Sequence, residues 1–337
     1  MVRMDLSTWH DQRTRDPRRL TLGSAQWGMP YGIANQAGPP SADELVAMLE
    51  RAQAAGISTI DTARAYGESE VSIGRALRGE AFQEAGQGFR IVTKLDPSVH
   101  TQGLDILETF DRVNASLGRS REALGLDVLP TVLLHRFAHR HACGGKLWRL
   151  LLTERDAGRI GALGVSAATP EEAWAALEDP DVQVLQVATS LLDLRLHQQG
   201  FFPRARELGR TVYVRSIFLQ GVAHLHPDTL PPFLTELAEP IRRIEQYAAE
   251  RDVPSRALYL AFARDLLPGA HPVVGCENDA QLSELLDDWT NDAIDAGVLS
   301  PLVDALPVHQ AETVDPAKWP KSASTTPQAS AVPTPRI

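Results

Sequence analysis

Residues 41–61, SADELVAMLERAQAAGISTID, hold one complete helix-and-strand unit of a kind that recurs along the chain. The start at Ser41 to Glu44 resembles a capping box, and Gly56 is typical of the position just after a helix. The run ISTID at 57–61 then predicts a short strand. Apolar side chains between cap and glycine follow the i, i+3, i+4, i+7 spacing of a buried helical face: Leu45, Met48, Leu49 and Ala52.

Short apolar runs of this kind alternate with amphipathic segments along most of the chain. They are rich in Val, Ile and Leu without strict alternation, as expected of strands that are buried on both faces. Eight strand–helix units predict an α/β fold, a (β/α)8 TIM barrel with extended loops at its C-terminal face. A doubly wound sheet is the alternative, but it usually needs fewer strands. The runs span 20–25, 57–61, 90–94, 129–135, 160–166, 182–187, 211–216 and 271–275.

Further signals mark a second helix and the two ends of the chain. A helical face is expected after the Pro231-Pro232 pair, and Gly158 and Gly209 resemble Gly56 in preceding a predicted strand. We expect three parts: a polar, Arg-rich, solvated extension over 1–19, one barrel domain over 20–318, and a disordered Pro/Ser/Thr-rich tail over 319–337. The face after the prolines comprises Leu234, Leu237, Ile241, Ile244 and Ala248.

Composition narrows the class of protein. The chain has 337 residues, and its 33 Lys and Arg against 43 Asp and Glu give a net charge of −10. This balance argues against a nucleic-acid-binding protein, and two cysteines cannot build a disulfide framework. No apolar run approaches the ~18 residues of a membrane span, and the first residues lack the apolar core of a signal peptide. We therefore expect a cytoplasmic protein without a membrane partner; its oligomeric state is open.

Ionisable residues stand where the predicted strands end. Asp61 ends the second run, Lys94 the third and His135 the fourth, while Tyr66 follows Asp61 by five residues. In a parallel barrel these ends meet at one face, where active sites lie. Singly, each residue has a structural explanation; together they form a coherent acid–base set.

These four groups suit proton transfer coupled to carbonyl reduction. An ammonium beside a phenol favours the phenolate, so Lys94 would assist Tyr66 as general acid or base. Asp61 would hold Lys94 charged, and His135 would hydrogen-bond the substrate oxygen. The carboxylate pairs Glu68/Glu70 and Asp287/Asp288 are interpreted as solvated helix faces rather than as glycosidase acids.

Two other groups of residues could belong to the site: a His- and Cys-containing run and a pair of aromatic residues. The His- and Cys-containing run at 135–143 fits no familiar zinc spacing, so we expect no metal and interpret it as a loop over the barrel mouth. Trp27 and Tyr31 would shape a substrate pocket, or serve as packing aromatics.

The sequence resembles the aldo-keto reductase superfamily over roughly residues 20–318. The resemblance implies an NAD(P)(H)-dependent oxidoreductase acting on an aldehyde or ketone, or on the matching alcohol, with Asp61, Tyr66, Lys94 and His135 as its catalytic tetrad. VRSIFLQG is similar to bacterial members associated with sugar-like or secondary-metabolite carbonyls. The matching segments are LGSAQWG, TIDTARAYGESEVSIGRAL, IVTKL, VLLHR, GALGVS, LQVATSLLD, VYVRSIFLQG and VVGCENDAQLSELL.

The resemblance also implies cofactor-binding residues. Ser166 and Gln186 match positions that hold the nicotinamide carboxamide. The segment after the seventh strand matches one that approaches the nicotinamide and pyrophosphate, and Gly275 to Gln281 matches the adenosine-phosphate pocket. The individual residues of these two segments are Arg215, Ser216, Ile217, Leu219 and Gln220, and Gly275, Glu277, Asn278 and Gln281.

The sequence departs from the family pattern at three of these places. Ala167 stands where many members have Asn, Arg215 where many have an aromatic residue, and Glu277 where many have a basic or hydroxyl residue. A carboxylate at Glu277 would repel a 2′-phosphate or accept a hydrogen bond from a ribose hydroxyl. NADP(H) and NAD(H) therefore both remain candidate cofactors. Two other functions stay open: a cofactor-binding regulatory barrel with little turnover, and a redox-neutral epimerase or dehydratase that retains its cofactor.

Overall fold

Eight parallel strands close into a barrel in this computed structural model, which describes residues 15–32, 38–83, 88–101 and 104–320. Each strand pairs with the next, and β8 pairs back with β1 through Thr21 opposite Val273. Every predicted run overlaps one strand, so the (β/α)8 prediction is confirmed. The strands are β1 (Thr21–Gly23), β2 (Thr59–Asp61), β3 (Arg90–Lys94), β4 (Leu129–Leu134), β5 (Ile160–Ser166), β6 (Val184–Ala188), β7 (Thr211–Arg215) and β8 (Ala270–Gly275).

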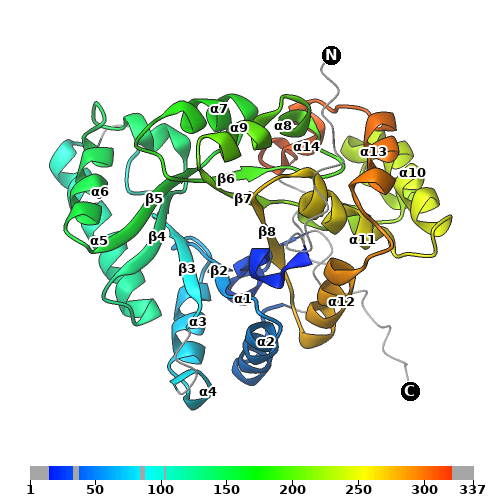
Figure 1. Cartoon of the computed structure of the whole chain (residues 1–337). Helices are drawn as coiled ribbons and strands as arrows, with labels where there is room; N and C mark the ends of the chain where they lie inside the picture. The colour runs from blue at the N-terminus through cyan, green and yellow to red at the C-terminus, as the bar shows by residue number, and fades with distance from the viewer. Residues whose placement is uncertain (1–14, 33–37, 84–87, 102–103, 321–337) are drawn as a thin grey trace, which may run out of the picture.

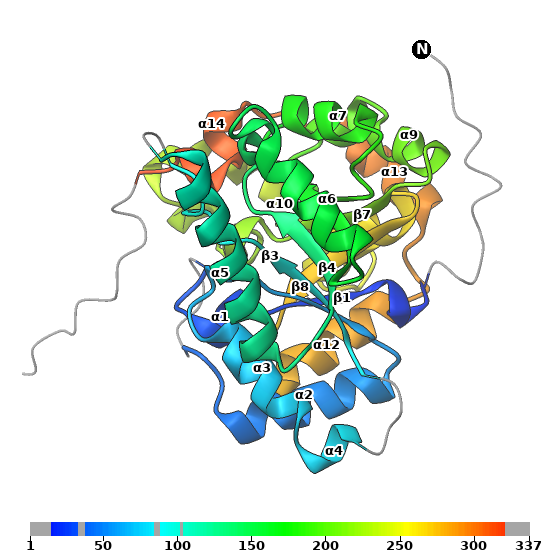
Figure 2. The ribbon, with the colours of Figure 1, turned by 90° about the vertical axis from the view of Figure 1, so that its left-hand side faces the viewer.

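Helices surround the strands as an outer ring (Figure 1), and a view at right angles shows α3 and α5 running along the outside of the barrel (Figure 2). The α-helices are α1 (Ala25–Gly28), α2 (Ala42–Ala54), α3 (Ser69–Leu77), α4 (Glu80–Gln83), α5 (Ile106–Leu124), α6 (Lys146–Asp156), α7 (Pro170–Glu178), α8 (Arg195–Gln198), α9 (Phe201–Glu207), α10 (Ala238–Ala249), α11 (Ser255–Ala261), α12 (Asp279–Thr290), α13 (Ala296–Ala305) and α14 (Ala311–Val314). Shorter turns are η3 (Pro17–Arg19), η4 (Phe137–His141), η5 (Leu219–His224), η6 (Pro227–Thr229), η7 (Pro232–Leu237), the π-helical η8 (Phe262–Leu266) and η9 (Pro316–Lys318). Every helix within the described ranges is too short or too polar to cross a membrane.

Helix α2 forms as its sequence predicts. The backbone N–H of Ser41 donates to the Glu44 carboxylate at 2.8 Å, and the Glu44 N–H donates to the Ser41 hydroxyl at 3.3 Å, which completes the capping box. The predicted apolar face is buried against the barrel. Gly56 follows the helix with φ +94°, a conformation that favours glycine and turns the chain into β2.

The predicted helix after Pro231-Pro232 begins later than its apolar pattern suggests. All five residues of the predicted face are buried, but residues 232–237 form the 3₁₀ turn η7 and only 238–249 form α10. Proline lacks an amide hydrogen and is best tolerated in the first turn of a helix. Pro232 and Pro240 therefore each stand in the first turn of their own element.

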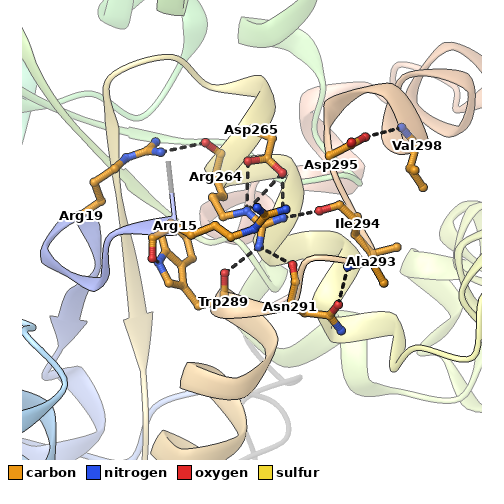
Figure 3. Close-up of polar contacts among 10 residues, drawn as sticks. All are labelled: Arg15, Arg19, Arg264, Asp265, Trp289, Asn291, Ala293, Ile294, Asp295 and Val298. Atoms are coloured by element: carbon orange, nitrogen blue, oxygen red, sulfur yellow. Dashed lines mark hydrogen bonds and ion pairs between the residues drawn. The ribbon is translucent and has the colours of Figure 1, made fainter. Parts of the chain in front are cut away.

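The N-terminal segment that we expected to be solvated packs on the barrel from residue 15. Arg19 donates to the carbonyl oxygens of Arg264 at 2.9 Å and Ala270 at 3.1 Å, and the Trp289 indole donates to the Arg15 carbonyl at 3.1 Å. Figure 3 shows this contact beside the Arg264 side chain. Residues 1–14 of the predicted extension lie outside the described residues.

Arg264 ties three chain segments together at the same place (Figure 3). Its side chain is fully buried, and its guanidinium donates to both oxygens of the Asp265 carboxylate and to the carbonyl oxygens of Trp289 at 2.6 Å and Asn291 at 3.0 Å. A further bond goes to the Ile294 carbonyl. All five N–H donors are thus satisfied, and the guanidinium binds carbonyl groups that the C-terminal end of α12 leaves free.

At the C-terminal end, the packed part of the chain extends slightly beyond the predicted boundary of 318. Trp319 is 9% exposed, and its indole donates to the Thr313 carbonyl at 3.0 Å. Residues 321–337 of the predicted tail lie outside the described residues.

Two carboxylates that we assigned to solvated helix faces are buried, which corrects that interpretation. Glu70 is 1% exposed, accepts a bond from the Thr93 hydroxyl at 2.6 Å and pairs with Arg64. Asp288 is 4% exposed and pairs with Arg256. Sequence spacing did not identify these partners, because Thr93 lies on β3, Arg64 on the loop before α3 and Arg256 on α11.

Candidate active site

The structure brings the four residues of the predicted tetrad together at one end of the barrel. Asp61 ends β2, Lys94 ends β3, and His135 directly follows β4. Tyr66 lies on the loop that connects β2 with α3. Their catalytic roles stay a prediction, whereas their convergence is a property of the fold.

Lys94 and Asp61 form a buried ion pair. The Lys94 Nζ donates to the two Asp61 carboxylate oxygens at 2.7 and 2.8 Å and to the Thr62 carbonyl at 3.0 Å, so all three ammonium protons have acceptors. Burial alone would lower the pKa of Lys94, but the charge of Asp61 and the phenol of Tyr66 outweigh it and raise the pKa above its ordinary value. The lysine therefore stays charged although only 1% of it is exposed.

Tyr66 lies beside this charge and beside His135. The Lys94 Nζ is 5.1 Å from the centre of the Tyr66 ring. The Tyr66 and His135 rings stand nearly perpendicular, with centres 6.0 Å apart.

Two glycines hold the Tyr66 loop, a role that their sequence pattern did not predict. A Cβ on Gly67 would lie 2.2 Å from the Gly28 carbonyl oxygen, and a Cβ on Gly28 would lie 2.0 Å from the Tyr66 carbonyl oxygen. The two backbones therefore touch, and Gly67 in addition has φ +54°. The AQWG and YGE segments were the only sequence signal for this contact.

His135 is neutral at physiological pH. Burial and the positive charges of Lys94 and Arg215 lower its pKa to about 3. A neutral imidazole donates through one nitrogen and accepts through the other. Its Nδ1 is buried and has no partner among the described residues.

Gln186 supports the ion pair from β6, which the sequence did not reveal. Its side chain is fully buried, and Nε2 donates to the Asp61 carboxylate at 2.7 Å. The Oε1 atom is buried without a partner among the described residues. Ser166 lies opposite Gln186 in the strand register. A buried acceptor in need of a donor fits the carboxamide of a nicotinamide, so this observation agrees with the predicted cofactor.

A cavity of about 420 Å³ opens above these residues. Ten predicted site residues line it: Asp61, Tyr66, Tyr31, Arg215, Ser216, Ile217, Gln220, Gly275, Glu277 and Gln281. The other seven are not among the residues that line it: Lys94, His135, Ser166, Gln186, Trp27, Leu219 and Asn278.

The two predicted pocket aromatics have different places. Tyr31 lines the cavity, and burial together with nearby Tyr66 raises its pKa. Trp27 is 2% exposed, and its indole donates to the Cys276 carbonyl at 2.9 Å. Trp27 thus ties α1 to the residue that follows β8, and a substrate contact for it stays a prediction.

The segment after β7 adopts an unusual backbone. Ser216, Leu219 and Gln220 have φ values of +64°, +46° and +55°, which strain side chains other than glycine. The Ile217 carbonyl accepts a bond from the buried Ser190 hydroxyl at 2.7 Å. Strain concentrated in a cavity wall is typical of ligand-binding segments.

Arg215 brings a positive charge to the cavity. Its guanidinium donates to the Ser216 hydroxyl at 3.3 Å and to the Ala167 carbonyl at 3.4 Å. Among the described residues no carboxylate forms an ion pair with it. In the same part of the chain, no group of three or more His, Cys, Asp or Glu side chains is arranged to hold a metal ion.

Comparisons with known proteins agree with this geometry. The model of the Aldo/keto reductase family matches residues 19–300. A D-threo-aldose 1-dehydrogenase from a Pseudomonas species is 27% identical over 308 residues, which are 80% of this chain and 91% of that protein.

Two solved structures show the same fold. The aldo-keto reductase AKR11C1 from Bacillus halodurans, in its holo form, has a TM-score of 0.66 at 17% identity and covers 88% of this chain and 95% of its own. The glycerol dehydrogenase AKR11B4 from Gluconobacter oxydans has a TM-score of 0.65 at 21% identity. The match covers 93% of this chain and 95% of that dehydrogenase.

Proposed function

The chain belongs to the aldo/keto reductase family, and we propose that it is an oxidoreductase that interconverts an aldehyde or ketone with its alcohol by means of a nicotinamide dinucleotide. Tyr66 is the general acid for reduction and the general base for oxidation. The observation that carries this proposal is the buried Lys94–Asp61 pair beside Tyr66 and a neutral His135.

Each of the four residues has a distinct task. In reduction the Tyr66 hydroxyl gives its proton to the substrate oxygen, and the Lys94 ammonium stabilises the phenolate that remains. Asp61 holds the ammonium in place and charged. Neutral His135 binds the substrate oxygen and sets it at hydrogen-bonding distance from Tyr66, without competing as a stronger acid.

The chain offers groups that would hold the cofactor. A bound nicotinamide dinucleotide supplies the hydride for reduction or accepts it in oxidation. Gln186 Oε1 and Ser166 would bind the carboxamide, the strained segment 216–220 would follow the pyrophosphate, and the start of α12 would lie along the adenosine end. The carboxamide and pyrophosphate contacts are the same for NAD(H) and NADP(H), which differ only at the adenosine ribose.

We further propose a sugar-like substrate that carries several hydroxyl groups. The D-threo-aldose 1-dehydrogenase relative supports this class. The cavity wall also supplies polar groups for hydroxyls, among them Tyr31, Gln220 and His224.

The test is a Tyr66→Phe variant assayed with a panel of aldoses, ketoses and simple aldehydes. The absorbance of the reduced cofactor reports turnover, and protein fluorescence reports cofactor binding. We expect kcat to fall by about 10²–10⁴-fold, the usual contribution of general acid–base catalysis, while the cofactor Kd changes little.

Tyr259→Phe is a matched control. Tyr259 is buried on α11 outside the cavity wall, and its hydroxyl has no partner among the described residues. That variant should keep its turnover. Unchanged turnover in Tyr66→Phe would remove the basis of the proposed mechanism.

A further inference from the structure

The wall of the cavity between α11 and α12 is acidic, and we infer from it that this protein selects NAD(H) and rejects NADP(H). The inference rests on the proposed function, since it assumes a nicotinamide dinucleotide as cofactor. The inference concerns the charged side chains that would surround the adenosine end of that cofactor.

The cavity has two chemically different ends. Asp61 and Tyr66 line one end, and side chains of α11 and α12 line the other. A dinucleotide whose nicotinamide lies beside Tyr66 must extend its adenosine half along the remaining cavity. The adenosine ribose therefore comes to the α11–α12 wall.

Carboxylates outnumber cations on that wall. Glu277, Glu284 and Asp288 line it, and Arg256 is the cation among its described residues. Formal charges at pH 7 give this wall a net charge of −2, from three acidic groups and one basic group.

Arg256 is already held by two of these carboxylates. Its guanidinium pairs with buried Asp288 and lies 3.4 Å from the Glu284 carboxylate. An added phosphate would have to compete with both carboxylates for the guanidinium, and separating Asp288 from Arg256 would leave a buried charge without its partner.

The N-terminus of α12 does not offset the negative charge of this wall. A helix N-terminus ordinarily attracts a phosphate through its free N–H groups. Here the Gln281 N–H donates to the Asn278 side chain at 2.9 Å, and the Glu277 N–H donates to the Gln281 side chain at 2.8 Å. Asp279 in the first turn adds a carboxylate, which pairs with Arg51.

The wall should therefore bind the adenosine ribose of NAD(H) more favourably than the phosphorylated ribose of NADP(H). A 2′-phosphate monoester carries a charge of about −1.5 to −2 at pH 7, and like charges repel it. A 2′-hydroxyl can instead donate a hydrogen bond to a carboxylate. Glu277 has acceptor capacity for such a bond, because its carboxylate accepts only one bond from the described side chains, from the Gln281 amide at 3.3 Å.

Calorimetric titration of the full chain with NADH and NADPH tests the preference directly. ADP and 2′,5′-ADP are titrated in parallel, because these fragments carry the adenosine end and lack the nicotinamide. We expect NADH to bind at least about tenfold more tightly than NADPH, and ADP more tightly than 2′,5′-ADP, since two excess negative charges face the phosphate. The difference should shrink as salt is added.

The double variant Glu277→Gln, Glu284→Gln removes the excess charge and leaves the Arg256–Asp288 pair intact. We expect it to bind NADPH about tenfold more tightly than the native chain does, with a smaller change for NADH. Asp287→Asn is the matched control, because Asp287 is an exposed carboxylate of the same helix outside the cavity wall. It should leave both affinities unchanged.

The outcomes separate the inference from the proposed function. Equal or tighter binding of NADPH by the native chain overturns the inference and leaves the oxidoreductase standing, as does a preference that the double variant leaves unaltered. Mass spectrometry of the denatured protein identifies any cofactor that copurifies, and NADP(H) in that sample counts against the inference. If neither dinucleotide binds and none copurifies, the proposed function itself fails.

Discussion

Replacing Asp61 with Asn should destabilise the fold, because it leaves the buried Lys94 ammonium without a counter-charge. In the native chain, Asp61 accepts two bonds from Lys94 and one from Gln186. Removing one partner of a buried ion pair typically costs about 3–5 kcal/mol. The unfolding entropy of 337 residues, at about 2.1 cal/mol/K each, is about 0.7 kcal/mol/K, so Tm should fall by about 4–7 °C.

The stability loss should depend on pH in a defined direction. Lys94 in the variant can escape the penalty by losing its proton, which costs about 1.4 kcal/mol per pH unit below its ordinary pKa of ~10.4. Its folded pKa is then depressed, the unfolded chain binds more protons, and stability rises with pH. Between pH 7 and 9 the variant should regain up to about 2.7 kcal/mol relative to the native chain. The native Lys94 has a raised pKa, so its stability contribution falls only above about pH 10.

A second substitution separates stability from catalysis. The double variant Asp61→Asn, Lys94→Met buries no charge at this place, and it should recover most of the lost Tm. It should stay inactive, because no ammonium remains beside Tyr66. Thermal melts from pH 6 to 9, followed by circular dichroism, measure all three proteins. A native-like Tm for Asp61→Asn at pH 7, or a loss that does not change with pH, would refute the reasoning.

Two further predictions concern Arg264, which supports the barrel wall, and His135 of the candidate active site. Arg264→Met should lower the unfolding free energy by about 3–5 kcal/mol, because it strands the Asp265 carboxylate and three carbonyl groups; chemical denaturation measures this, and a loss below about 1 kcal/mol would contradict it. With a His135 pKa of about 3, the pH profile of kcat/KM should show no ionisation of this imidazole between pH 5 and 8. Comparing profiles of the native chain and a His135→Gln variant checks that expectation, and an acidic limb that disappears in the variant would count against it.

Local signals in the sequence predicted the eight strands and helix α2. Buried apolar runs marked the strands, and the Ser41 cap and Gly56 marked the ends of α2, because both depend on residues close in the chain. The pattern failed after Pro231, where prolines divide one predicted helix into η7 and α10. Period alone does not distinguish a 3₁₀ turn from an α-helix when the same side chains face the core.

Some features of the candidate site could likewise be predicted from the sequence, and others could not. Strand ends of a parallel barrel share one face, so the convergence of Asp61, Lys94 and His135 followed from the strand prediction. The contact of Gly28 with Gly67 and the bond from Gln186 to Asp61 did not follow, since each joins segments far apart in sequence or depends on backbone approach.

By itself, the sequence determined the barrel, the direction in which its strand ends point and the residue types gathered there. Those depend on hydrophobic period and on a topology that places every strand end at one face. Only the tertiary structure decided which charges are paired. It buried Glu70 and Asp288 that helix pattern assigned to solvent, joined Arg256 to two carboxylates and left Arg215 without one among the described residues. The energy of a charge pair depends on the distance between the charges and on their burial. Both are set by how separate elements pack together, and the sequence pattern does not specify either.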